Sequence, residues 1–439
     1  MIDRYINNKI NAIWNDQNKF DTWKLIQEKY VETLEQLKIA KGGVAKKIQE
    51  AEVLKEEVYK QEEITNHDLA SFVDILQTKV GEGSNWVHYG LTSSDIVDTA
   101  NSLLIMQSIE VAQELIHDLL KELKLKAIDE KDTKIIGRTH GVYAEETFLG
   151  NIFGNWYLEI KRSLVRVERA KDSIAFGKLS GPVGNHTVVT EEMEKLTLEK
   201  LGLKSEIFAS QIVNRDRYAE VFTSLSILAS TYERVSTNLR SYQRSEISEM
   251  YEPFKDGQKG SSAMPHKKNP IGSERITGLA RIMRGYTLSG LENMVLWNER
   301  DISNSSVERI ALPDCFNLIC FMTSELTSII SDLVINYEQI KVNLNNAKSK
   351  SMSQQMLSHL VNEGVNREEA YKVIQEESFK NLSPNEIKTN LEKHFSVEFP
   401  DFDTHDSQNI SKESFEDKFC LLYTSDAADE GLGVDLGGR

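Results

Sequence analysis

The stretch VFTSLSILASTYERVSTNL, residues 221–239, decides the fold class. Its apolar side chains recur at steps of four and three residues: Val221, Leu225, Leu228, Tyr232, Val235 and Leu239. This spacing places them on one stripe of an α-helix. Because the spacing holds over many turns, it predicts a long helix packed at a shallow angle in a bundle.

A second stripe of the same kind runs from Ile105 to Leu123. The chain has seven prolines, and none precedes Pro182. Since a proline inside a helix costs about 3 kcal/mol, the proline-free stretches permit long helices. The alternation of apolar and polar residues that marks half-buried strands is scarce. We therefore predict an all-α protein with a central bundle of long helices and little sheet.

The chain is long enough for about two or three domains. It has 439 residues, 40% of them hydrophobic and 27% charged, as in ordinary globular proteins. We expect an N-terminal helical domain over 1–110, a central bundle over 111–350 and a C-terminal helical domain over 351–420. The last segment, 421–439, loses periodicity and has four glycines in its last nine residues, so we expect an atypical, disordered or non-native tail.

The net charge of −16 argues against a nucleic-acid or anionic-membrane partner, because phosphate attraction needs a basic surface. No apolar run reaches the roughly 18 residues of a membrane span, and the opening MIDRYINNKI lacks a signal peptide's apolar core. The three cysteines, Cys315, Cys320 and Cys420, show no zinc-site spacing. We expect a cytoplasmic protein with reduced thiols and no bound metal.

Four segments concentrate polar groups in a loop-like context: NHDLASF (66–72), HYGLTSSD (88–95), GRTHG (137–141) and KGSSAMPHKKNP (259–270). Each contains a histidine, the side chain best able to exchange a proton near neutral pH: His67, His88, His140 and His266. A single such histidine is more often a helix cap or a core residue. Four together favour a shared cleft.

The segment 259–270 is bracketed by Pro253, Pro265 and Pro270, which predicts a loop between two helices. Its residue types suit a solvated turn. They also suit a carboxylate site, because Ser261 and Ser262 adjoin flexible Gly260 and are followed by the cation of Lys267 and the amide of Asn269. These groups can stabilise negative charge that develops on a bound carboxylate.

A basic set lies in WNERDISNSSVER (297–309), where Arg300, Ser305 and Arg309 suit a phosphate or a carboxylate. The alternative is an exposed helix face whose arginines pair with acids in the same segment: Glu299, Asp301 and Glu308. For NRDRY (214–218) we favour a structural ion-pair network.

The stretch GSSAMPHKKNP (260–270) resembles the signature loop GSSxMPxKxN of the fumarase/aspartase superfamily of lyases. Several other stretches together resemble the adenylosuccinate lyase family within it: RY (4–5), HD (67–68), GLTSSD (90–95), GRTHG (137–141), ERDISNSSVER (299–309) and GVNREEAYKVIQ (364–375). The resemblance covers nearly the whole chain except the odd tail.

The resemblance implies a three-domain lyase that forms homotetramers around a helical core, with active sites shared between subunits. The family releases fumarate from adenylosuccinate, giving AMP, and from SAICAR, giving AICAR, in purine biosynthesis. It uses no metal or organic cofactor. The loop 259–270 would then be a mobile flap that closes over the substrate.

The resemblance also implies roles for single residues. Ser261 would be the general base, His140 the general acid, and Glu274 the carboxylate that orients the histidine. The succinyl group would meet His88, Thr92, Ser93, Lys267 and Asn269. The phosphate end would meet Arg4, Tyr5, Arg300, Ser305 and Arg309. The rest of the substrate would contact Asn66, His67, Asp68, Gln211 and Ser262.

The chain departs from the family pattern at five positions that bear on pocket detail: Tyr143, Glu146, Pro182, Asn298 and Asn304. Two alternatives stay open. One is a sibling lyase acting on argininosuccinate, aspartate or malate, which has no need for arginines around a phosphate. The other is a structural protein that has kept the fold and lost the chemistry.

Overall fold

The computed structural model describes residues 1–380, 382–400, 415 and 417–419. The chain forms two compact units, each built from segments that are distant in the sequence. Unit 1 comprises Met1–Asp118, Ile160–Arg234 and Arg275–Leu326, and unit 2 comprises Leu119–Glu159, Val235–Glu274 and the residues from Thr327 onward. The domain boundaries expected near residues 110 and 350 stay predictions, and the tail 421–439 lies outside the described residues.

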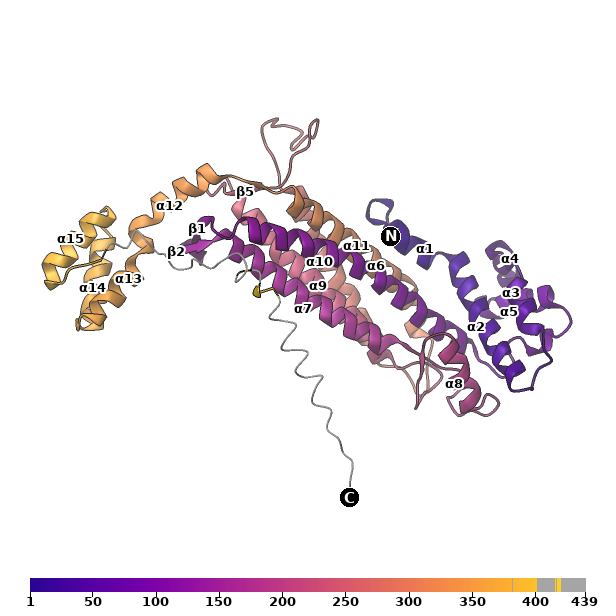
Figure 1. Ribbon diagram of the computed structural model, residues 1–439. Coiled ribbons are helices and arrows are strands. Elements are labelled where there is room, and N and C mark those ends of the chain that lie inside the picture. The colour runs from indigo at the N-terminus through magenta and orange to yellow at the C-terminus, as the bar shows by residue number, and fades with distance from the viewer. Residues whose placement is uncertain (381, 401–414, 416, 420–439) are drawn as a thin grey trace, which may run out of the picture. The chain divides into compact units, whose positions relative to one another are not determined.

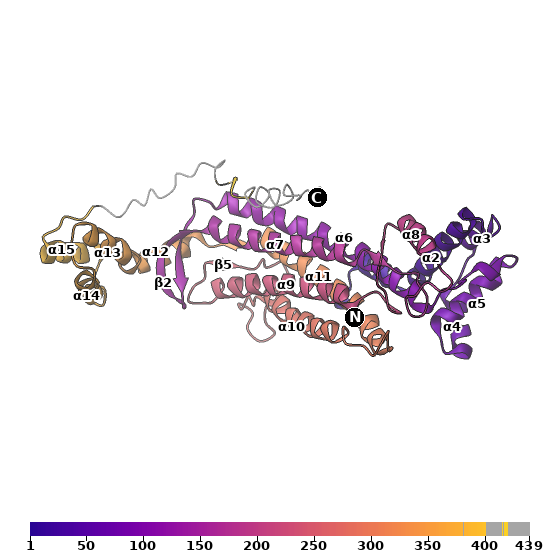
Figure 2. The same ribbon diagram turned by 90° about the horizontal axis from the view of Figure 1, so that it is seen from below.

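Five long helices contribute residues to both units: α6 (Ser93–Asp129), α7 (Leu149–Ile174), α9 (Arg215–Tyr242), α10 (Ile271–Glu292) and α11 (Ser303–Ser331). Within unit 1 their segments lie side by side (Figures 1 and 2). The stripe from Val221 to Leu239 lies in α9, and all six of its apolar side chains are buried. The prediction of an all-α bundle is confirmed.

Helix α11 continues through Pro313, where the backbone lacks one hydrogen-bond donor. Asn317, one turn further along, donates from Nδ2 to the carbonyl of Pro313 at 2.9 Å. Its Oδ1 accepts the backbone N–H of Asn7 at 2.8 Å. The proline turn of α11 is therefore also the place where the N-terminal segment is anchored.

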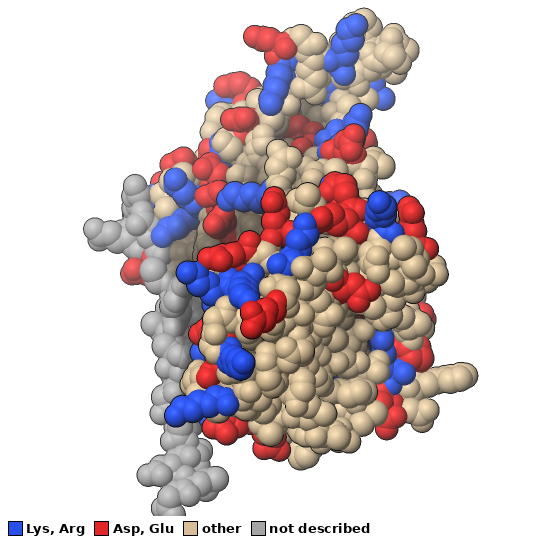
Figure 3. All heavy atoms as spheres, turned by 90° about the vertical axis from the view of Figure 1, so that its right-hand side faces the viewer, with Lys and Arg blue, Asp and Glu red and all other residues tan. Residues whose placement is uncertain are grey.

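The rest of unit 1 consists of helix α2 (Asp16–Gln36) and shorter elements: η1 (Asp3–Tyr5), α1 (Asn8–Trp14), α3 (Val44–Glu50), α4 (Lys55–Thr65), α5 (Asp68–Val80), η2 (Ser84–Trp86), α8 (Glu191–Lys200) and the parallel pair β3 (Phe176–Gly177) and β4 (Lys204–Ser205). Their core contains Phe20, Trp23 and Phe72, with ring centroids 5.3 Å apart for Phe20 and Trp23 and 5.6 Å for Trp23 and Phe72. On the face turned to the viewer in Figure 3, acidic and basic side chains are interspersed.

Unit 2 contains the antiparallel hairpin β1 (Lys134–Thr139) and β2 (Val142–Phe148), the short antiparallel pair β5 (Met250–Tyr251) and β6 (Val334–Ile335), and α12 (Tyr337–Ser351), α13 (Ser353–Asn362), α14 (Arg367–Ser378) and α15 (Pro384–Phe395). Helices α13 to α15 share a small core that includes Met356, Leu360, Ile374, Ile387 and Leu391.

The expectation of little sheet is confirmed, but the loop-like character expected for GRTHG is wrong in part. Gly137–Thr139 belong to strand β1, and only His140 and Gly141 form the turn. The strand was not predicted from periodicity because neighbouring Ile135 and Ile136 are both buried and the register shifts just after them.

None of the described helices is both long and apolar enough to span a membrane.

Candidate active site

The residues expected to form the site fall into two groups, one in each unit. Unit 1 holds Arg4, Tyr5, Asn66, His67, Asp68, His88, Thr92, Ser93, Gln211, Arg300, Ser305 and Arg309. Unit 2 holds His140, Ser261, Ser262, Lys267, Asn269 and Glu274. The chemistry expected for proton transfer thus belongs to unit 2, and that expected for the nucleotide belongs to unit 1.

In unit 1, His67 connects two of the motifs. Asn66 ends α4 in a left-handed conformation, and His67 is the N-cap of α5, where its Nδ1 accepts the N–H of Ala70 at 3.3 Å. Its other ring nitrogen, Nε2, lies 3.3 Å from the hydroxyl of Ser93. The segments 66–72 and 88–95 therefore meet at this histidine, although both also begin helices and are only partly loops.

His88 is held by a buried glutamine on α2. Gln27 accepts the backbone N–H of His88 through Oε1 at 2.9 Å, and its Nε2 lies 3.0 Å from Nδ1 of the ring. Because the amide nitrogen can only donate, Nδ1 is the acceptor and Nε2 carries the ring proton. Burial lowers the pKa of His88 to about 4, so the ring is neutral at neutral pH.

Arg309 contacts two residues expected to share its site. Its Nη2 donates to Oδ2 of Asp68 at 2.6 Å, and its Nε lies 3.4 Å from the hydroxyl of Ser305. Burial opposes ionisation of Asp68, but the guanidinium outweighs it, so the pKa of Asp68 lies below its ordinary value. The ion pair therefore links two different helices, α5 and α11.

A cavity of about 200 Å³ opens beside this pair, lined among others by Lys19, Asp68, Arg300, Asn304, Ser305 and Arg309. Within the described part of the chain, two of its buried polar atoms have no hydrogen-bond partner: Nε of Arg300 and Oδ1 of Asn304. Nδ2 of Asn304 donates to Glu308, which fixes the amide so that Oδ1 is the open acceptor. The wall of the cavity therefore contains one unpaired donor and one unpaired acceptor.

The predicted ion-pair network of NRDRY is confirmed. Arg215 is buried and donates to both oxygens of Asp98, at 2.6 and 2.9 Å, and of Glu308, at 2.8 and 3.1 Å. Arg217 pairs with Glu206 at 2.7 Å. Glu308 thus serves Arg215, which contradicts the alternative in which it pairs with an arginine of its own segment.

Three more of the expected residues of unit 1 do not line this cavity: Gln211, Tyr5 and Arg4. Gln211 accepts Nη1 of Arg300 through Oε1 at 3.1 Å and donates from Nε2 to the carbonyl of Pro182 at 3.2 Å. Tyr5 packs edge-on against Phe321 with ring centroids 5.0 Å apart. Arg4 is exposed, and neither Arg4 nor Tyr5 is among the described residues that line the cavity.

In unit 2, His140 lies at the tip of the β1–β2 hairpin. His140 and Gly141 have φ of 55° and 77° and are flanked by the paired residues Thr139 and Val142. Positive φ at both positions is typical of a tight type I′ hairpin turn. The hairpin is anchored below its tip, since Arg138 makes two 2.8 Å bonds to the buried carboxylate of Glu249.

Three of the expected site residues, Asn66, His88 and His140, have positive φ, with values of 51°, 62° and 55°. Non-glycine residues adopt this left-handed conformation at an energetic cost, and such strain is concentrated at functional sites. Two residues that hold these positions were not predicted from the sequence: Gln27, which bonds His88, and Glu249, which bonds the hairpin of His140 through Arg138. For Gln27 the available signal was a polar residue on an otherwise apolar stripe of α2.

The loop 259–270 is stabilised by its own hydrogen bonds. The hydroxyl oxygen of Ser261 accepts the N–H groups of Ala263 and Met264 at 3.3 and 3.1 Å. Asn269 donates from Nδ2 to the carbonyl of Gly260 at 2.8 Å and so joins the two ends of the loop. A Cβ on Gly260 would lie 2.0 Å from the carbonyl oxygen of Lys267, so this position requires glycine.

Helix α10 begins directly after this loop. Its first N–H groups, at Gly272 and Ser273, donate to the carboxylate of Glu252 at 3.1 and 2.6 Å. Glu274 is exposed in the first turn, as are Ser262 and Lys267 in the loop. Among the described residues of unit 2, no two of His140, Ser261 and Glu274 hydrogen-bond to each other.

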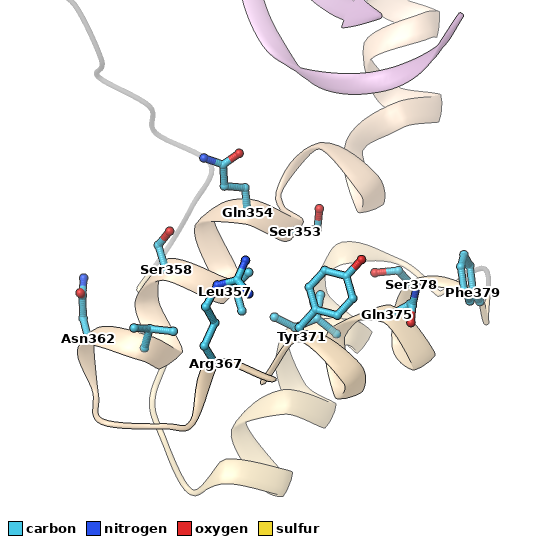
Figure 4. A pocket seen from close by; sticks show the side chains of 12 residues that line it. Ser353, Gln354, Leu357, Ser358, Asn362, Arg367, Tyr371, Gln375, Ser378 and Phe379 are labelled. Atoms are coloured by element: carbon cyan, nitrogen blue, oxygen red, sulfur yellow. The ribbon is translucent and has the colours of Figure 1, made fainter. Parts of the chain in front are cut away.

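A second cavity, of about 740 Å³, lies in unit 2 and is lined by residues of α13 and α14 that include Leu357, Arg367 and Tyr371 (Figure 4). None of the expected site residues lines it. Across the described residues, no group of three or more His, Cys, Asp and Glu side chains is arranged to hold a metal ion.

The sequence matches a family model described as Lyase over residues 13–285. It is 40% identical over 425 residues to the adenylosuccinate lyase of Thermotoga maritima, covering 96% of each chain. It is also 40% identical over 382 residues to that of Bacillus subtilis, covering 85% of this chain and 87% of the relative. A fumarate lyase from Mesorhizobium sp. BNC1 has a similar fold, with a TM-score of 0.81 at 19% identity over 95% of each chain.

Proposed function

The chain belongs to the lyase family, and within it to the adenylosuccinate lyases, and from this premise we propose that it cleaves adenylosuccinate into AMP and fumarate and SAICAR into AICAR and fumarate. In this elimination a base removes a proton from the carbon beside a succinyl carboxylate. The electron pair becomes the double bond of fumarate, and the bond from the neighbouring carbon to nitrogen breaks. The departing nitrogen then takes up a proton.

The cavity of unit 1 is the observation that carries the nucleotide part of this proposal. Arg300, Ser305 and Arg309 line one space, and guanidinium groups grip phosphate with two parallel hydrogen bonds. The open donor on Arg300 and the open acceptor on Asn304 suit the neighbouring phosphate and sugar hydroxyl groups. Sibling lyases acting on argininosuccinate, aspartate or malate have no phosphate for such a set to bind.

For the proton transfers we assign Ser261 as the general base and His140 as the general acid, with Glu274 orienting the histidine. A serine hydroxyl is a weak base, so its alkoxide form needs stabilisation. The two backbone N–H groups that donate to Ser261 Oγ supply it, because hydrogen bonds to the charged form favour that form. Lys267 would stabilise the charge that develops on the succinyl carboxylate.

We propose that the protein assembles as a homotetramer whose subunits share active sites. Helix α10 and the residues after it expose large apolar side chains that a monomer would leave in water: Ile282, Leu288, Leu291, Met294, Val295 and Trp297. Val295 and Trp297 are 81% and 80% exposed. Light scattering should give four times the chain mass, and replacing Leu288 and Leu291 by Lys should reduce both the mass and the activity.

We also propose a cytoplasmic location without a nucleic-acid or membrane partner. The two cysteines within the described residues, Cys315 and Cys320, are buried free thiols, which is typical of a reducing compartment.

Fumarate release from purified protein tests the function directly. Adenylosuccinate and SAICAR should each yield fumarate, and argininosuccinate, aspartate and malate should not. Cleavage of argininosuccinate with adenylosuccinate left intact would overturn the purine assignment. Absence of fumarate from every substrate, with the fold intact by circular dichroism, would favour the catalytically inactive relative.

A further inference from the structure

Unit 1 contains an ion pair that lies entirely out of water. The ammonium of Lys178 contacts Oδ1 of Asp95, and neither side chain is exposed. Asp95 lies in the first turn of α6, and Lys178 directly follows strand β3. Because removing two charges from water is costly, a fully buried ion pair is weakly explained by stability alone. Its hydrogen bonds indicate another purpose.

The pair holds two loops together. The second carboxylate oxygen of Asp95, Oδ2, accepts the N–H of Thr92 at 2.8 Å, which fixes the turn just before α6. The ammonium of Lys178 also donates to the carbonyl of Gly181 at 3.0 Å. Thr99, one turn further along α6, exchanges two 3.2 Å hydrogen bonds with the backbone of Lys178. The lysine is therefore held at both its backbone and its ammonium group.

The loop that begins at Gly181 leads on to the nucleotide end. The carbonyl of its next residue, Pro182, accepts Nε2 of Gln211 at 3.2 Å, and Oε1 of Gln211 accepts Nη1 of Arg300 at 3.1 Å. A continuous path thus leads from Thr92 through the buried pair to Gly181, and then through Pro182 and Gln211 to Arg300. Each step is a direct contact, except for the peptide bond between Gly181 and Pro182. Both end points are residues that we assign to substrate binding, Thr92 to the succinyl group and Arg300 to the phosphate.

We infer that Lys178 and Asp95 are positioning residues that set the separation between the succinyl-binding turn at Thr92 and the nucleotide-binding guanidinium of Arg300. The inference rests on the proposed function. Neither side chain reaches solvent, so both act through the residues they hold. Rigid placement matters because an error of about 1 Å in a bound substrate can cost about 10²-fold in rate.

The test separates positioning from stability by removing both charges at once. In Lys178→Met alone, Asp95 stays buried without its cation, so the melting temperature should fall. Adding Asp95→Asn removes the stranded charge and keeps an acceptor for Thr92, so the melting temperature should recover. The link from Lys178 to Gly181 stays broken, so kcat/KM for adenylosuccinate should stay down by about 10²-fold, with KM raised.

The matched control neutralises Arg217 and Glu206, a largely buried pair of unit 1 outside this chain of contacts, with Arg217→Met and Glu206→Gln. Its kcat/KM should stay within about twofold of the parent. A double Lys178/Asp95 variant that regains both its melting temperature and its kcat/KM would overturn the inference. If the melting temperature of the double variant does not recover, the test is made with Thr99→Val instead, which removes the two hydrogen bonds to the backbone of Lys178. An unchanged KM for adenylosuccinate in Thr99→Val would overturn the inference. Failure of the unmodified protein to release fumarate would instead refute the proposed function.

Discussion

Nη2 of Arg309 lies 2.6 Å from Oδ2 of Asp68, although 241 residues separate them in the chain. The pair brings the start of α5 against α11 at the wall of the 200 Å³ cavity. In the proposed site, a phosphate bound by Arg309 would meet a guanidinium that is already paired with Asp68. The acid would then act on the nucleotide through the arginine, as an orienting partner.

Arg309→Lys should raise KM for adenylosuccinate by about 10- to 100-fold, the equivalent of one charge-assisted hydrogen bond. Lysine keeps the charge but cannot donate to phosphate and to Asp68 in the same planar geometry. Steady-state kinetics measure this. Arg217→Lys is the control, because Arg217 pairs with Glu206 and does not line the cavity, and its KM should not change. An unaltered KM in Arg309→Lys would remove Arg309 from the phosphate site.

Ser261→Ala and His140→Ala should each lower kcat by at least about 10²-fold, the usual contribution of an acid or base group. Both residues lie at least partly in solvent, on the loop and at the hairpin tip, so neither substitution should change the melting temperature. His117→Ala, at an exposed position of α6, is the control and should retain full turnover. Near-normal turnover in either site variant would refute the role assigned to that residue.

Gly260→Ala should impair catalysis through the backbone alone. The added Cβ would lie 2.0 Å from the carbonyl oxygen of Lys267, so the loop must shift and Ser261 must move with it. Since a shift of about 1 Å can cost about 10²-fold, we expect a loss of that order in kcat/KM. Gly154→Ala, on α7 where nothing lies within 4 Å of the added Cβ, should leave kcat/KM intact and stabilise the helix slightly. Full activity in Gly260→Ala would contradict the tight loop conformation.

His88 should make the protein less stable as the pH falls. Its pKa is about 4 in the folded state and 6.5 ordinarily, so between these values the unfolded chain binds a proton that the folded chain excludes. Stability is therefore complete above pH 6.5 and declines towards pH 4, by about 3 kcal/mol from this group. Urea unfolding of the protein and of His88→Asn at pH 7 and pH 4 measures the difference. Equal losses in both would show that His88 is not the group responsible.

The fold could be predicted where its signals are local. The stripe from Val221 to Leu239 needs only helical geometry to place its side chains on one face, and α9 buries all of them. The hairpin that carries His140 could not be predicted in this way. The burial of its strands does not alternate, and the bulge near Gly137 depends on pairing with β2.

The residue types of the candidate site were also visible in the sequence, since loops rich in serine, histidine, lysine and arginine stand out against amphipathic helices. Their partners did not stand out. Gln27 and Glu249 are both buried, Gln27 on α2 and Glu249 just before β5, and only the positions of His88 and Arg138 explain why a polar side chain is buried there.

The sequence by itself determined the helical architecture, the loop at Ser261 and the family, because periodicity and short motifs are properties of neighbouring residues. Tertiary structure alone decided which charges meet. Asp68 pairs with Arg309, 241 residues away in the sequence, and Asp95 pairs with Lys178, 83 residues away. Such pairs depend on how whole helices pack, and no local pattern encodes that packing.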